Sequence, residues 1–98
     1  MPTSNESEPR RRDVAAGLAE HKLDAMLVSH GANLRYLSGF TGSNGSLLIL
    51  DGKSILFTDP RYRIQAAQES TCQVKVAKGP LGDEIARAIQ RSGARRIG

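Results

Sequence analysis

Sulfur and aromatic side chains are scarce in this sequence. It contains a single cysteine, Cys72, so an internal disulfide cannot form and no CxxC pair exists for redox or zinc chemistry. It has no tryptophan, two tyrosines and two phenylalanines. Nucleic-acid binders usually combine a concentrated run of positive charge with stacking aromatics, whereas the net charge of +4 is spread here over both ends of the chain. The composition therefore argues against a nucleic-acid partner.

Long hydrophobic runs are also missing. No apolar stretch approaches the roughly 20 residues that span a bilayer. The first twelve residues, MPTSNESEPRRR, are polar and lack the apolar core of a secretory signal. We therefore expect a cytoplasmic protein without a membrane partner. The length of 98 residues fits one domain with a thin core.

The common catalytic and metal-binding motifs are absent as well. His21 and His30 are nine residues apart, HExxH does not occur, and no GxSxG is present for a nucleophile elbow. Both histidines are typical of surface or capping positions. We therefore assign no catalytic residue and no metal ligand to this chain, and we expect it to be inactive by itself.

The pattern of apolar residues predicts an amino-terminal helix and a buried strand. Residues 1–8 are polar and are expected to form a disordered tail. A helix should run from about Pro9 to Glu20, capped by Ser7, with Pro9 in its first turn. A short strand is expected over 24–29.

The middle of the chain carries the strongest local signals. A short helix over 33–38 has Asn33 as a possible cap and Gly39 as a possible end. The β-rich runs 46–50 and 54–58 flank an Asp-Gly turn, which predicts a hairpin. Four consecutive apolar residues in the first run indicate that both faces of the sheet are covered by helices.

The remaining third predicts a helix, an edge strand and a second helix. Asp59 and Pro60 should begin the first helix, which extends to about Glu69. Residues 73–77 alternate as an edge strand does, and a helix from Leu81 should end at Ser92-Gly93. This order defines an α/β domain with a mixed sheet flanked by helices. The last residues, ARRIG, resemble the start of another strand, so we expect residues 9–98 to be one domain of a longer chain.

The glycine-rich stretch at residues 39–45 reads GFTGSNG. A phosphate-binding loop would need a lysine and a Ser or Thr after its glycines, and would lead into a helix. Here Ser46 and Leu47 follow, and the next element is a predicted strand. The stretch is therefore not a phosphate cradle.

Two motifs in this region carry a family resemblance. They are NLRYLSGFTGSNG at 33–45, before the hairpin, and TDPRY at 58–62, after it. In order and spacing they resemble the amino-terminal domain of the creatinase, prolidase and Xaa-Pro aminopeptidase family, and are most similar to the Xaa-Pro aminopeptidases. The similarity covers about residues 9–98. Pro60 departs from the pattern, because family members more often have glycine there.

The resemblance implies a ribonuclease H-like α/β domain that precedes a pita-bread catalytic domain absent from this sequence. That second domain would hold two divalent metal ions (manganese, zinc or cobalt), and the parent would be a hydrolase cleaving before proline. The first domain would help substrate access and dimerisation. The implied partners are the catalytic domain, a homodimer mate and a proline-containing peptide.

The resemblance also gives candidate contact residues for the substrate channel or the second domain: Phe40, Thr41, Asn44, Arg61 and Tyr62. Several alternatives stay open. Phe40 either anchors the loop to the core or faces a partner domain. Ser43 and Asn44 either satisfy the turn or contact substrate. Arg61 pairs with Asp59 or with a partner carboxylate, and the position of Tyr62 is typical of a core residue.

Three functions fit these observations. The first is a non-catalytic domain of a proline-specific metallopeptidase, which we favour. The second is a stand-alone binding or dimerisation module without peptidase chemistry. The third is a basic nucleic-acid adaptor, which would require salt-dependent binding.

Overall fold

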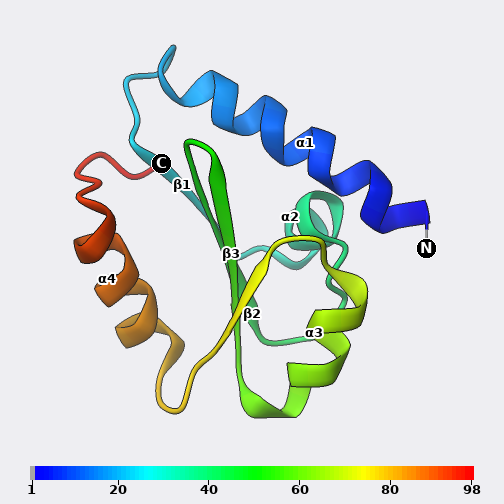
Figure 1. Cartoon of the computed structure of the whole chain (residues 1–98). Helices are drawn as coiled ribbons and strands as arrows, with labels where there is room; N and C mark the ends of the chain where they lie inside the picture. Colours follow the sequence, from blue (N-terminus) through cyan, green and yellow to red (C-terminus); the bar gives the residue numbers. More distant parts are fainter. Residues whose placement is uncertain (1) are drawn as a thin grey trace.

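A four-stranded mixed sheet with helices on both faces forms the domain (Figure 1). The computed structural model describes residues 2–98, and their side chains from residue 7 on. The elements in chain order are α1 (Pro2–Leu18), β1 (Ala25–Val28), α2 (Gly31–Ser38), β2 (Gly45–Leu50), β3 (Lys53–Thr58), the 3-10 turn η1 (Pro60–Tyr62), α3 (Arg63–Glu69), β4 (Gln73–Val76) and α4 (Leu81–Ser92). The predicted α/β class and mixed sheet are confirmed.

The sheet has the strand order β1-β2-β3-β4. β1 and β2 are antiparallel, β2 and β3 are antiparallel, and β3 and β4 are parallel. The predicted hairpin is confirmed: Leu50 pairs with Lys53 across the turn, and Gly52 has a φ of 77°. A positive φ is readily adopted only by residues such as glycine, so the Asp-Gly pair sets this turn.

Successive side chains along the strands point to opposite faces of the sheet and pack into two separate hydrophobic cores. Leu47, Ile49 and Leu56 pack on the face that α1, α2 and α3 cover. Leu48 and Phe57 pack on the opposite face, under α4. Because both faces are buried, β2 can be apolar at successive positions, as its sequence indicated.

The beginning of α1 differs from the prediction. The helix starts at Pro2 and ends at Leu18, so Pro9 lies inside it and residues 2–8 are helical where we expected a disordered tail. Met1 lies outside the described residues. Ser7 does not cap the helix. It is fully buried, and its hydroxyl accepts a hydrogen bond from Arg11 Nη1 at 3.3 Å.

Arg11 explains why this part of α1 packs against the domain. Its guanidinium is buried and donates to the carbonyl of Leu37 at 2.9 Å and to Thr71 Oγ1 at 2.8 Å. These bonds tie α1 to the end of α2 and to the segment before β4. Tertiary contacts of this kind can outweigh weak local helix propensity.

The ends of α2 confirm one predicted cap and correct the other. Gly39 ends the helix in a left-handed conformation with a φ of 84°, and its N–H donates to Arg35 O. Asn33 is not the amino-terminal cap, because the helix already begins at Gly31 and His30 occupies that position.

The predicted start of a further strand is also present. Ile97 forms a parallel bridge with Ala25 of β1. The N–H of Gly98 donates to Ala25 O at 2.9 Å, and the N–H of Leu27 donates to Gly98 O at 3.2 Å. After β4, helix α4 therefore carries the chain across the sheet to the outer side of β1 (Figure 1). Within residues 2–98, no helix combines the length and apolar character needed to cross a bilayer.

Candidate functional site: a polar network at the open end of the hairpin

Strand register brings the two sequence motifs together. Gly45 at the start of β2 pairs with Thr58 at the end of β3. The residues just outside this pair, Asn44 and Asp59, are therefore neighbours although they are 15 positions apart. The Thr58 hydroxyl closes the junction by donating to Asn44 O at 2.6 Å.

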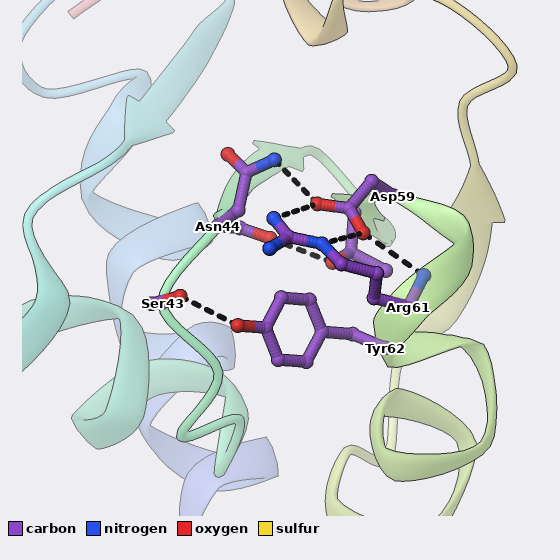
Figure 2. A network of polar contacts seen from close by, with 6 residues as sticks. Ser43, Asn44, Asp59, Arg61 and Tyr62 are labelled. Atoms are coloured by element: carbon purple, nitrogen blue, oxygen red, sulfur yellow. Dashed lines mark hydrogen bonds and ion pairs between the residues drawn. The ribbon is translucent and has the colours of Figure 1, made fainter.

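Asp59 is the centre of the network (Figure 2). Its Oδ2 accepts from Asn44 Nδ2 at 2.6 Å and from Arg61 Nη2 at 2.9 Å. Its Oδ1 accepts from the backbone N–H of Arg61 at 2.9 Å and from Arg61 Nε at 3.0 Å. The carboxylate thus caps η1, as predicted, and binds the guanidinium in a two-pronged ion pair.

These contacts favour the charged forms of both partners. The side-chain bonds from Arg61 and then Asn44 hold the pKa of Asp59 far below its usual 3.8, against a smaller opposing effect of burial. The same ion pair raises the pKa of Arg61. The Arg61 side chain remains 70% exposed, so the pair lies at the surface with its cation facing solvent.

Tyr62 joins the loop to η1 on the other side of the network. Its hydroxyl shares a hydrogen bond of 2.5 Å with Ser43 Oγ, which lowers the pKa of Tyr62. Its ring meets that of Phe40 edge-on, with centroids 5.7 Å apart. Tyr62 is half-buried, so it packs against the core while its hydroxyl reaches the loop.

Phe40 anchors the loop within this domain. Its ring is 1% exposed and belongs to the core under α1, α2 and α3. Side-chain atoms placed on Gly42 or Gly45 would collide with that ring, because a Cβ on Gly45 would lie 2.9 Å from Phe40 Cε2. The glycines are therefore needed for close approach to Phe40. The alternative that its ring faces a partner domain is wrong.

A second tether fixes the first half of the loop to α3. The N–H of Thr41 donates to Glu69 Oε1 at 2.8 Å, and its hydroxyl donates to Glu69 Oε2 at 3.0 Å. Gln65 Nε2 donates to Thr41 Oγ1 at 3.0 Å. Thr41 is exposed, but its polar groups are already engaged.

The structure thus brings together all five predicted contact residues, although in different roles. Phe40 and Thr41 hold the loop in place, whereas Asn44, Arg61 and Tyr62 form the polar surface. Sequence reasoning identified Asp59 as a helix cap and as a possible partner of Arg61, and both roles are confirmed. It did not place Asp59 beside Asn44, and it missed Gln65 and Glu69. The hairpin register was a signal that could have placed Asp59 beside Asn44.

Two polar groups of the network have no partner among residues 7–98. The carboxylate can only accept, so Asn44 presents Nδ2 to Asp59 and its Oδ1 points away (Figure 2). The Arg61 Nη1 group is likewise not engaged. An acceptor and a cationic donor are therefore available side by side for a polar ligand or a neighbouring protein surface. In the part of the chain that the structure describes, no three potential metal ligands lie together.

The fold and this loop place the chain in a known class of domain. Residues 10–98 match the model of the creatinase/prolidase N-terminal domain. The chain belongs to this family.

Individual relatives agree with the family match. The N-terminal domain of the cytoplasmic peptidase PepQ from Mycobacterium tuberculosis is 40% identical, with a TM-score of 0.83 over 92% of this chain and 71% of that one. The Xaa-Pro dipeptidase from Bacillus anthracis is 27% identical, with a TM-score of 0.84 over 97% of this chain and 26% of that one. The uncharacterized peptidase YqhT of Bacillus subtilis is 35% identical over 77 residues. That match covers 78% of this chain but only 22% of the relative.

Proposed function

We propose that this chain is the non-catalytic amino-terminal domain of a proline-specific metallopeptidase, and that it shapes substrate access and supports dimerisation. The parent would be an Xaa-Pro aminopeptidase or dipeptidase in the cytoplasm, with two divalent metal ions in a separate catalytic domain. The observation that carries the proposal is the preorganised network around Asp59. It stands on a family domain whose relatives include a protein named an Xaa-Pro dipeptidase.

The polar surface fits a role at the entrance of a peptide-binding site. The open Oδ1 of Asn44 can accept a hydrogen bond from a peptide N–H, and Arg61 can donate to a carbonyl or carboxylate. Asp59 fixes both side chains, so little conformational entropy is lost when they engage a ligand. Tyr62 completes this surface, and Phe40 and Thr41 hold its loop in position.

The test uses the complete protein encoded by the gene. Asn44→Ala and Arg61→Ala should each raise KM for an Xaa-Pro peptide or lower kcat/KM by about tenfold, the size expected for one lost polar contact. Matched controls are Asn33→Ala and Arg87→Ala, which change the same residue types at exposed positions outside the network. Unchanged kinetics in both test variants would reduce the stretch at 39–45 to a connector.

A stand-alone binding or dimerisation module is the second candidate, and the same domain would serve it without chemistry. The two are separated by the complete protein's activity. If the complete protein binds metal and hydrolyses an Xaa-Pro peptide, the peptidase proposal stands. If it dimerises but neither binds manganese nor cleaves the peptide, the module is correct.

A further inference from the structure

A cleft lies at the opposite end of the hairpin from the Asp59 network, between α4 and the outer strand β4. It has a volume of about 250 Å³. It arises because α4 packs on the face of β2 and β3, while β4 extends the sheet beyond the helix. The cleft shares no residue with the Asp59 network.

Strand register explains which side chains line this cleft. Gln73 pairs with Ile55 and Lys75 pairs with Phe57, so these four side chains lie on the α4 face of the sheet. Lys53, two residues before Ile55, points to the same face. The cleft therefore has an apolar floor, made by Ile55 and Phe57, beside two lysines.

The helix adds a third cation. Ala88 and Arg91 are three residues apart on α4 and share one helix face, which borders the cleft. Positive groups from three elements, Lys53 of β3, Lys75 of β4 and Arg91 of α4, thus surround one hollow. Among residues 7–98, no carboxylate lines it.

These three cations lack ion-pair partners in the described part of the chain. The ion pairs found there involve Arg12, Arg61 and Arg87 instead. Arg91 uses only Nε, which donates to Arg87 O at 3.4 Å. Asp24 and Asp51 line a neighbouring hollow that also touches Lys53. Glu8 lines another such hollow and is paired with Arg12 at 3.3 Å. Asp24 is already bound by the backbone N–H groups of Arg95 and Arg96.

We propose that this cleft binds a small carboxylate with a short apolar part. The carboxylate would accept from Lys53, Lys75 and Arg91, and its hydrocarbon would lie on Ile55, Phe57 and the methylene groups of the lysines. Three converging like charges repel one another, and an anion between them removes that repulsion. The side-chain amide of Gln73 at the rim offers a further hydrogen-bond donor. The site is independent of the proposed peptidase role.

The test is an NMR titration of the 98-residue chain with phenylacetate at constant ionic strength. Amides of β3, β4 and the last turn of α4 should shift and saturate, with a Kd on the order of 1 mM for a ligand this small. Acetate carries the charge alone and benzyl alcohol the ring alone. Each should bind at least tenfold more weakly.

Variants locate the binding. Lys75→Met and Arg91→Met keep the apolar stems and should each weaken phenylacetate binding at least fivefold, whereas Asp51→Asn should tighten it. Lys78→Met is the matched control, because Lys78 is exposed but lies outside the cleft, and it should change nothing. Absence of saturable shifts, or full affinity in both test variants, would overturn the proposal. If acetate bound as tightly as phenylacetate, the cleft would hold an adventitious ion only, and the proposal would be wrong.

Discussion

Charged side chains are arranged in opposite ways at the two ends of the β2–β3 hairpin. At the open end, Asp59 neutralises Arg61 and binds Asn44, so the polar groups fix one another. At the turn end, Lys53, Lys75 and Arg91 meet around a cleft without an ion-pair partner among the described residues. Polar groups that satisfy one another's hydrogen bonds make a surface rigid, whereas charges without a counter-charge attract ligands of the opposite sign. The comparison predicts that substitutions at the first end change the stability of the fold as well as the proposed substrate contact, whereas those at the second change anion binding with little effect on stability.

The largest effect should come from removing the anchor of the loop. Phe40→Ala deletes a ring that is 1% exposed and should lower the free energy of unfolding by about 3–5 kcal/mol. Guanidinium denaturation followed by circular dichroism measures it. Tyr36→Ala is the control, because that ring is 56% exposed and should matter far less. Equal losses in the two variants would contradict the anchoring role.

A smaller loss is expected from filling the space beside that ring. A Cβ on Gly42 would meet Phe40 Cζ and would lie 2.9 Å from Tyr62 Cδ1. Gly42→Ala should therefore cost about 1–3 kcal/mol through forced repacking, measured in the same denaturation experiment. Gly17→Ala has nothing within 4 Å of the new atom and sits in a helix, so it should not destabilise the domain.

The ion pair at the open end should give a pH-dependent effect. The pKa of Asp59 is lower in the folded state than its usual 3.8, chiefly because of Arg61 and then Asn44. The ionised carboxylate therefore stabilises the fold fully above that value, and the contribution is lost as the pH falls below it toward the folded pKa. The difference in melting temperature between the parent chain and Asp59→Asn should be constant from pH 7 to pH 5 and shrink below about pH 4.

Arg61→Met provides the cross-check for that titration. In an Arg61→Met background, Asp59 keeps only Asn44 and the backbone N–H as partners, so the acid-dependent part of the Asp59→Asn effect should decrease. An unchanged pH profile in that background would mean that Arg61 is not the main cause of the pKa shift.

The smallest effects on stability should occur at the turn end. Lys75→Ala and Arg91→Ala remove exposed charges that lack carboxylate partners, so each should change the free energy of unfolding by no more than about 0.5 kcal/mol. Thermal melts at low and high salt measure this. A clear loss of stability in either variant would show that these cations stabilise the fold and are not a free binding site for an anion.

Local chemistry made much of this fold predictable. The Asp-Gly turn predicted the hairpin, and the glycines at 39 and 93 predicted two helix ends; in the structure both residues adopt the positive φ that glycine readily allows. The capping role of Asp59 also followed from a neighbour two positions away. Turns and helix ends set by adjacent residues were thus largely predictable, although Ser7 and Asn33 do not cap their helices.

Features that depend on distant residues were not predictable in the same way. The extension of α1 back to Pro2 accompanies contacts between Arg11 and Thr71, 60 positions apart, and local patterns carry no trace of them. The burial of Phe40 and the tie from Thr41 to Glu69 likewise depend on how α3 folds back over the loop. The site therefore emerged as a set of candidate residues, while its connections required the tertiary structure.

The segment that follows α4 reaches the outer edge of β1, and this has a consequence for how the chain folds during synthesis. The hairpin and β1 can pair as soon as residue 58 leaves the ribosome, because their contacts are local. The outer edge of β1 is covered only when Arg96 reaches Asp24, 72 positions away. Until then a nascent chain carries an open strand edge, the kind of surface through which unfinished chains associate. Ribosome-bound chains in which residues 94–98 have not yet emerged should therefore depend more on chaperones than chains in which they have.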